Sequence, residues 1–531
     1  MTAQGLRWTS EQVLELAPDA SSRSAANRLA TPSPWSETGA DGEAVWGRCA
    51  GSGGTRYQTV VDLLGNPAPA YRCSCPSRKF PCKHALALLL RWSEGETAVA
   101  PATGRPDWAR EWLDARRARA ERAVDGAAAR GTGREPAKGA AGGETPGGAR
   151  RRAPADPEAA RRRAERRSQR VAAGATELEQ RLADLLNGGL AGADRAGYAR
   201  WDEMAARMVD AQAPGLASRV RELGSHTTGA DWPGRLLSEC ALLHLLNVSC
   251  LRLDELPEPL AATVRTRVGH TVDSAELLAD PAARVRDEWL VLGRRDETMG
   301  RLTARRIWLR GHRSGRTALL LSFGPPGGAP ELALPVGLSV EADLAFHPGA
   351  PPLRAALGER YGPPGAGFVP DGEALPEAPA AYARALAEDP WLEGWPVVLR
   401  GVLPIPPGVD GGPEEWQLAT EPAPEGWELG VPPADEAAGQ GRSGEGPAPE
   451  DAGRAGGRET ETGPEAAPST EELGQRRAWV AVPVHPETAS GALWKLLALS
   501  GGAPLTVFGE HGHRGFAPYS AWSADGTAVP L

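Results

Sequence analysis

The chain has 531 residues, and its hydrophobic fraction of 41% with 17 tryptophans is sufficient for about two to four folded domains. A formal net charge of −9 argues against a surface that is basic throughout, so any contact with nucleic acid has to be local. The 65 glycines and 49 prolines, together with long alanine-rich runs, predict that much of the length is linker.

Residues 1–115 form the first predicted unit. A short helix is expected with Ser10 as its N-cap, and the β-branched and aromatic residues of 45–51 and 56–63 predict two strands. Cys49 lies in the first of these strands. We interpret it as a small buried residue rather than as a metal ligand, because free cysteine is among the most buried residue types.

A metal-binding pattern follows the second strand. The chain reads Cys-x-Cys, six further residues and then Cys-x-His, and three thiolates with one imidazole at this spacing can close a tetrahedral zinc site. In an extended strand alternate side chains point the same way, so the first two cysteines aim at one point. Six cysteines in 531 residues do not indicate a disulfide scaffold. The four predicted ligands of one structural zinc ion are Cys73, Cys75, Cys82 and His84.

Pro76 and Pro81 bracket the loop within this pattern and turn the chain back toward the first two ligands. Leucines at helical spacing predict a helix after His84. Because four protein ligands leave no position for water, we expect the metal to hold the fold and not to catalyse hydrolysis. Positive side chains crowd the same segment, where they favour the thiolate form and are the candidate contacts to nucleic acid. They are Arg72, Arg78, Lys79 and Lys83.

The segment CSCPSRKFPCKH resembles the SWIM zinc finger, in which Cys-x-Cys is followed by a gap and Cys-x-His. Further stretches at 46–53, 57–62, 107–112, 201–217 and 496–510 are similar to bacterial SWIM zinc finger family proteins, so the resemblance extends over most of the chain. It implies a zinc-binding module that contacts nucleic acid or protein. Genes of this family often stand beside those of MoxR-type AAA ATPases and von Willebrand A-domain proteins.

Residues 116–175 are predicted to be a basic disordered linker. The stretch 114–170 carries 16 Arg or Lys against 8 Asp or Glu and almost no aliphatic side chain larger than alanine, so it cannot bury a core. Its cations either neutralise phosphates beside the finger or serve only as a soluble spacer. A helical bundle is expected over 176–288, where apolar residues recur at helical spacing. Cys240 and His244 on one of its helices are interpreted as core residues rather than as a second metal site.

The rest of the chain is predicted to be rich in β-structure. Strand-like runs between turns indicate an antiparallel β region at 289–350 and a Pro/Gly-rich β unit at 351–433. Residues 434–476 are acidic and lack large apolar side chains, so this segment is expected to be disordered. The α/β segment at 477–531 is expected to pair with the earlier β unit across it. The predicted fold class is multidomain α+β, with a zinc-stapled N-terminal module, a helical bundle, antiparallel β-rich C-terminal regions and disordered linkers.

No phosphate-binding loop, hydrolase motif or dinucleotide-binding turn is present, so no catalytic residue is assigned and we expect a protein that is not an enzyme. The start of the chain lacks a basic region followed by an apolar core. No apolar run approaches the roughly 20 residues that span a bilayer. We therefore expect a cytoplasmic protein without membrane contact.

The leading functional hypothesis is a zinc-binding, non-enzymatic protein that binds nucleic acid through the finger and the basic linker and binds other proteins through its remaining domains. The alternative is a scaffold for proteins alone, in which the cations only offset the charge of the thiolates. In line with the family resemblance, that scaffold would work with an AAA ATPase and von Willebrand A-domain system.

Overall fold

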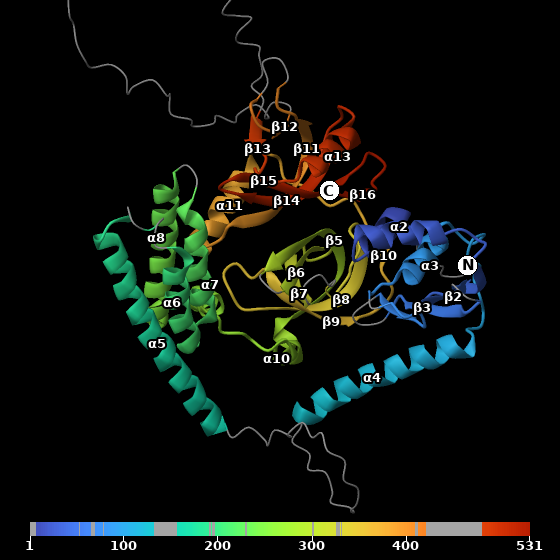
Figure 1. Ribbon diagram of the computed structural model, residues 1–531, viewed down its shortest axis with the longest axis horizontal. Coiled ribbons are helices and arrows are strands. Elements are labelled where there is room, and N and C mark those ends of the chain that lie inside the picture. The colour runs from blue at the N-terminus through green and yellow to red at the C-terminus, as the bar shows by residue number, and fades with distance from the viewer. Residues whose placement is uncertain are drawn as a thin grey trace, which may run out of the picture.

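The computed structural model arranges four folded regions around one another (Figure 1). A β-barrel lies at the centre, with an N-terminal module on one side, a helical bundle on the other and a C-terminal sheet above. None of the helices in the described ranges combines the length and the apolar character required to cross a bilayer. The described residues are 7–51, 54–64, 69–77, 79–131, 157–190, 193, 197–228, 231–299, 302–324, 330, 332–408, 413–420 and 480–531.

The N-terminal module is a four-stranded antiparallel sheet with helices on both faces. Its elements are α1 (Ser10–Glu15), α2 (Ala20–Leu29), β1 (Trp35–Ala40), β2 (Ala44–Ala50), β3 (Arg56–Asp62), β4 (Ala70–Cys73), α3 (Lys83–Ser93) and α4 (Asp107–Gly131). The strands follow one another in the order β1-β2-β3-β4. The helices α1 and α3 cover the face that buries Val45 and Val61, and α4 covers the opposite face over Trp46 and Val60. Neighbouring residues thus point to opposite faces, as the period of two in a strand requires.

Thr9, and not Ser10, is the N-cap of α1. The Thr9 hydroxyl accepts a hydrogen bond from the backbone N–H of Gln12, and the Gln12 side chain accepts one from the backbone N–H of Thr9. This reciprocal pair is a capping box, whose second member is Glu or Gln three residues after the cap. Counted from Ser10, that position is Val13, so the predicted cap is wrong by one residue.

Two long helices replace much of the predicted basic linker. The helix α4 extends as far as Gly131, and α5 (Pro157–Asn187) begins well before the expected start of the bundle. The prediction of disorder over 116–175 is therefore wrong at both ends of that range, while 132–156 lie outside the described residues. Alanine and arginine are strong helix formers, so a segment that cannot bury a core can still be helical.

Ion pairs hold the first half of α4 to the sheet. Arg116 Nε lies 3.1 Å from a carboxylate oxygen of Asp62, the last residue of β3, and Arg117 lies 2.6 Å from the carboxylate of Glu43. The cations that favoured a solvated linker in the sequence are thus partly engaged with carboxylates of the N-terminal module.

The helical bundle consists of α5 and four helices that follow it. They are α6 (Gly197–Asp210), α7 (Pro214–Leu223), α8 (Trp232–Leu251) and α9 (Glu258–Val268). Each contributes large apolar side chains to one core, among them Leu178, Trp201, Leu216, Leu243 and Val264. The bundle therefore begins before residue 176, where the predicted range starts, and its last helix ends at Val268, before that range ends at residue 288.

Cys240 lies in this core and is 1% exposed, as interpreted, but His244 does not. The His244 side chain is 54% exposed and its Nδ1 lies 2.5 Å from a carboxylate oxygen of Glu179. The interpretation of His244 as a core residue is wrong because α8 is apolar on both its buried and its exposed sides. Leu242 and Leu245, two residues before and one residue after His244, are also exposed, so the leucine-rich surroundings did not mark the buried face.

The central barrel closes through one parallel pair of strands. Its elements are β5 (Arg284–Met299), β6 (Leu302–Gly311), β7 (Thr317–Gly324), β8 (Leu338–Phe346) and β9 (Arg354–Arg360), with the short β10 (Gly365–Ala366) beside β8 and α10 (Ser274–Ala279) packed outside. Three consecutive strands, β5 to β7, are antiparallel neighbours, and β8 returns to the free edge of β5, which is a Greek-key order. The last strand, β9, pairs parallel to β7 and antiparallel to β8. Large side chains fill the interior, among them Trp289, Ile307, Leu320 and Leu344.

The prediction of antiparallel strands at 289–350 is right for most of the barrel and misses its closure. The first strand begins five residues earlier, and β9 lies in the segment predicted as the Pro/Gly-rich β unit. The parallel contact joins only Leu319 with Arg354 and Leu320 with Ala355. So short a pairing leaves no periodic signal in the sequence.

The C-terminal sheet is assembled from both sides of the predicted acidic segment. Its elements are α11 (Glu377–Glu388), β11 (Gly394–Ile405), β12 (Gln417–Thr420), β13 (Val480–Pro483), α13 (Ser490–Ser500), β14 (Leu505–Gly512), β15 (Gly515–Trp522) and β16 (Ala528–Pro530). The strand order is β13-β12-β11-β14-β15-β16, and every pair is antiparallel. The expectation that 477–531 pairs with the earlier β unit is confirmed. The acidic segment at 434–476 lies outside the described residues.

Buried polar side chains lie where the N-terminal module meets the barrel. Gln12 donates a hydrogen bond to the carbonyl of Val336 at 3.1 Å, and the carboxylate of Glu15 accepts one from the backbone N–H of Val336 at 3.4 Å. One oxygen of Glu15, the hydroxyl of Tyr71 and one Nη of Arg294 are buried here without a hydrogen-bond partner among the described residues. Burial raises the pKa of Glu15 and lowers that of Arg294.

Candidate metal centre

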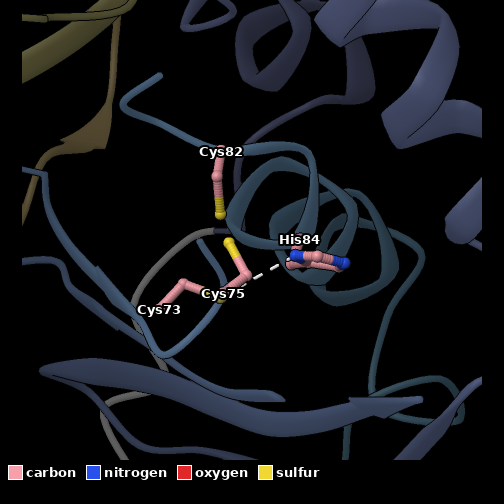
Figure 2. A group of neighbouring side chains, drawn as sticks. All are labelled: Cys73, Cys75, Cys82 and His84. Carbon is pink, nitrogen blue, oxygen red and sulfur yellow. Dashed lines mark hydrogen bonds between the residues drawn. The ribbon is translucent and has the colours of Figure 1, made fainter. Parts of the chain in front are cut away.

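The four predicted ligands come together between β4 and α3. Cys73 is the last residue of β4, and Cys75 follows two residues later. Cys82 is the N-cap of α3, and His84 lies in the first turn of that helix. Figure 2 shows these side chains turned toward one another, and one ligand atom from each lies within 4.8 Å of every other.

Strand pairing places the first two cysteines on one side of the chain. Cys73 is paired with Thr59 of β3, and beyond the end of β4 the backbone N–H of Ser74 still donates to the carbonyl of Gln58 at 3.0 Å. The backbone N–H of Gln58 in turn donates to the Ser74 hydroxyl at 2.9 Å. The extended backbone therefore continues past Cys73, and Cys75 returns to the same side, as the sequence predicts.

The other two ligands are held by a buried helix. Every residue of α3 from His84 to Trp92 is buried, between the sheet and the helices α1 and α2. The N-terminus of a helix carries a partial positive charge, which favours a thiolate at the position of Cys82. Core packing therefore also positions these two ligands.

The distances fit a single zinc ion. With zinc–sulfur distances of about 2.3 Å and zinc–nitrogen distances of about 2.0 Å, the ligand atoms of a tetrahedral site lie roughly 3.5–3.8 Å apart. The Sγ of Cys73 and the Nδ1 of His84 are 3.8 Å apart. No pair of ligand atoms exceeds 4.8 Å, so small side-chain movements complete the geometry. Three cysteines and one histidine are a donor set typical of structural zinc, and the protein binds one structural zinc ion here.

Electrostatic coupling among the thiols favours metal binding. A hydrogen bond with Cys82 lowers the pKa of Cys73 to about 3, and hydrogen bonds with His84 and Thr59 add to this effect against the opposing effect of burial. The same hydrogen bond raises the pKa of Cys82, and burial raises that of Cys75. The thiolate of Cys73 is thus held by neighbouring protonated groups. A dication that displaces those protons meets three thiolates and leaves one net negative charge.

The two ligands at the start of α3 are buried, and Cys73 and Cys75 are half-buried. Cys82 is 1% and His84 is 4% exposed, and the ring of Tyr57 lies 5.1 Å from the imidazole. A metal with four protein ligands has no open position for water or substrate, and a structural site has this arrangement.

Sequence reasoning missed two neighbours of the cluster on β3. The Oγ1 of Thr59 lies 3.3 Å from the Sγ of Cys73, and Tyr57 packs on His84. The two residues share one face of the predicted strand at 56–63, so a register between that strand and Cys73 would have found them. Cys49 is buried and outside the four-residue group, as interpreted, and burial raises its pKa to about 11.

The four predicted nucleic-acid contacts differ in their surroundings. Arg72 on β4 and Lys83 at the start of α3 are exposed and form no ion pair with a carboxylate of the described chain. Lys79 is exposed, but its Nζ lies 2.6 Å from a carboxylate oxygen of Asp19, whose pKa this contact lowers. Arg78 lies outside the described residues. Two of these cations beside the metal ligands therefore have no carboxylate partner among the residues that the structure describes.

Comparison with known proteins supports the site. The family model described as the SWIM zinc finger matches residues 65–93, which contain all four ligands. The chain therefore contains a segment similar to the SWIM zinc finger, and that segment includes its metal site. A second model, described as the SWIM-associated four-helix bundle domain, matches residues 166–268, from within α5 to the end of α9. No curated protein and no solved structure matches the chain.

Proposed function

We propose that this protein is a non-enzymatic binding protein of the cytoplasm whose finger contacts the phosphates of nucleic acid. The observation that carries the proposal is the pair of exposed cations at the metal site. Arg72 precedes the ligand Cys73, and Lys83 stands between the ligands Cys82 and His84. Zinc thus fixes the backbone on which both charges stand.

Exposure and the lack of a described carboxylate partner leave these charges accessible to a polyanion. Phosphate contacts position a protein on nucleic acid but carry no sequence information, so binding through Arg72 and Lys83 is expected to be independent of sequence. Each phosphate neutralised releases counterions, and the affinity falls as salt rises. The reduced thiols that zinc requires are typical of the cytoplasm.

A fluorescence titration of the full chain with a labelled DNA duplex tests the proposal. The double variant Arg72→Ala/Lys83→Ala should reduce the slope of log affinity against log salt by about 2, since each contact contributes about 0.9. The matched control is Arg28→Ala/Arg110→Ala, which removes two exposed arginines of α2 and α4 away from the ligands. If both variants bind with the slope of the wild type, the finger does not contact phosphates.

The alternative is a scaffold that binds only proteins. The ion pair between Lys79 and Asp19 favours it, because one cation of the finger is already engaged within the chain. The partner proposed from the family resemblance is an AAA ATPase of the MoxR type. A pull-down with such an ATPase that survives nuclease treatment, together with no affinity for DNA, would support the scaffold. Loss of the complex after nuclease treatment would contradict it.

A further inference from the structure

A basic pocket lies between the first half of α5 and the end of α9. It is open to solvent and has a volume of about 570 Å³. Its lining contains four arginines and one histidine, and no carboxylate of the described residues. The lining residues are Arg163, Ala164, Arg166, Arg167, Arg170, Gln212 and His270.

Helical spacing gathers the four arginines on one face of α5. They stand at positions i, i+3, i+4 and i+7, which share a face of a helix. From Arg163 to Arg170 the helix rises about 10 Å, since each residue adds about 1.5 Å. Glu165 is two residues from Arg163 and one from Arg166, so it projects away from this face. The other nearby acid, Glu158, pairs with Arg162 at 3.3 Å.

Two of the arginines are held in place by neighbouring elements. The Nη2 of Arg167 donates to the carbonyl of Gly269, the C-cap of α9, at 3.0 Å, and its Nε is buried without a described partner. The Nη2 of Arg170 donates to the amide oxygen of Gln212 at 2.7 Å. Neither contact neutralises the charge of a guanidinium group. The remaining N–H groups stay available to an anion.

The positive charges around the pocket affect the pKa of His270. Burial lowers the pKa of His270 first, and the guanidinium groups of Arg167 and Arg265 lower it further. An anion bound beside the imidazole would oppose both guanidinium effects.

We infer that this pocket is a second phosphate-binding site, which holds successive phosphates of one strand of a nucleic acid. Four cations spread over about 10 Å of helix match a chain of phosphates, spaced about 3.4 Å per nucleotide along the axis, better than one small anion. The inference rests on the proposed nucleic-acid binding but places it on the helical bundle, apart from the finger. The part of the predicted linker that is helical thus presents its arginines as an ordered array.

Alanine variants of the full-length zinc-loaded protein test the pocket. Arg163→Ala/Arg166→Ala removes two exposed lining arginines and keeps a strong helix former at each position. The matched control, Arg161→Ala/Arg162→Ala, removes two arginines of the same helix that do not line the pocket. For a duplex of about 20 base pairs, the pocket variant should lower the salt slope by about 2 and the affinity about tenfold or more relative to the control. Equal slopes for the pocket variant and the control overturn the site.

The same titration separates the two proposals. If Arg72→Ala/Lys83→Ala weakens binding while the pocket variant behaves as its control, the finger site stands and the pocket is wrong. If only the pocket variant weakens binding, the pocket stands and the proposed role of the finger is wrong. A wild-type protein that does not bind the duplex overturns both.

A spectroscopic measurement identifies the ligand. Nuclear magnetic resonance of the His270 imidazole should show its pKa rise when the duplex is added, because the phosphates offset the field of Arg167 and Arg265. Inorganic phosphate at the same total phosphate concentration should leave that pKa unchanged. An equal rise with inorganic phosphate would show a site for single phosphates and contradict the proposed polymer.

Discussion

The four metal ligands come from two short stretches of the chain. Cys73 ends β4 and Cys75 follows two residues later, Cys82 and His84 belong to one helix start, and only a short loop separates the pairs. Ligand type and spacing therefore suffice to group them.

Loss of one ligand is expected to unfold the N-terminal module and to leave the helical bundle folded. Cys82→Ser should abolish stoichiometric zinc, measured by elemental analysis, and reduce the free energy of unfolding of the module by about 4 kcal/mol, since a structural metal supplies folding energy. Limited proteolysis should then cut within 7–115 and spare the bundle. Cys49→Ala is the control, because Cys49 is buried outside the ligand group and should retain zinc. A Cys82→Ser protein with one zinc per chain would contradict the assignment.

The charged neighbours of the ligands could not be assigned in the same way. Lys79 pairs with Asp19, which is 60 residues away and comes from α2. Nothing in the spacing of the finger indicates that contact. The number of Lys and Arg residues near the motif is therefore larger than the number of positive charges that are free to bind a ligand.

Because the imidazole of His347 is buried, the barrel is expected to lose stability in acid. It follows β8, is 8% exposed, and burial, with a smaller effect of Arg354, lowers its pKa to about 4. In the unfolded chain its pKa is about 6.5, so the unfolded state binds a proton that the folded state does not. Stability should fall by about 3 kcal/mol as pH drops from about 6.5 to about 4, since one pKa unit corresponds to about 1.4 kcal/mol.

Urea unfolding at several pH values measures this effect. His347→Leu should flatten the pH dependence in that window, because the group whose pKa differs between the two states is absent. The exposed His513→Ala serves as the control and should keep the slope of the wild type. An unchanged slope in His347→Leu would show that another group titrates.

At the level of elements, the helices and strands with a periodic apolar pattern were predicted well. The error over 116–175 arose because a low content of large apolar residues was equated with disorder. Its two ends are instead helical, through residues of high helix propensity, and Arg116 ties α4 to Asp62. Composition predicted that the segment forms no core, but it did not predict its local structure.

The crossing of α5 and α6 depends on a glycine. A Cβ added at Gly174 would lie 2.4 Å from the Cβ of Ala211, which follows α6. Gly174→Ala should therefore destabilise the bundle by about 1–2 kcal/mol, although alanine is the better helix former. Thermal unfolding measures the change.

The swap Gly174→Ala/Ala211→Gly supplies the control for this crossing. It removes the close approach while keeping the composition, so it should recover most of the lost stability. A single Gly174→Ala variant more stable than the wild type would show that the two segments do not meet as described.

On the scale of the whole molecule, the sequence predicted the classes of the regions better than their boundaries. The parallel contact of β7 with β9 and the pairing of β12 with β13 join residues far apart in the chain. Such pairings depend on the three-dimensional path, and a local pattern does not record them. The β-strand at 354–360 was consequently assigned to the wrong unit.

The long segment between β12 and β13 is expected to be dispensable for folding. Thr420 is paired with Val480, so the ends of 421–479 are neighbours in the sheet. Replacing that segment with a turn of about four residues should leave the stability unchanged or raise it by up to about 2 kcal/mol, because a shorter loop costs less entropy to close. Chemical denaturation of the full chain and the shortened chain compares them. A shortened chain that fails to fold would show that the segment contributes to the sheet.

One strand connects the metal to the junction between two domains. Tyr71, whose hydroxyl is buried at that junction, stands two residues before Cys73 in β4. A chelator that removes the zinc should therefore loosen the packing of β4 around Arg294 of β5. Hydrogen exchange in β5 should then accelerate. Zinc would then stabilise the contact between the N-terminal module and the barrel. In a cell depleted of zinc, these two domains would be less firmly packed against each other.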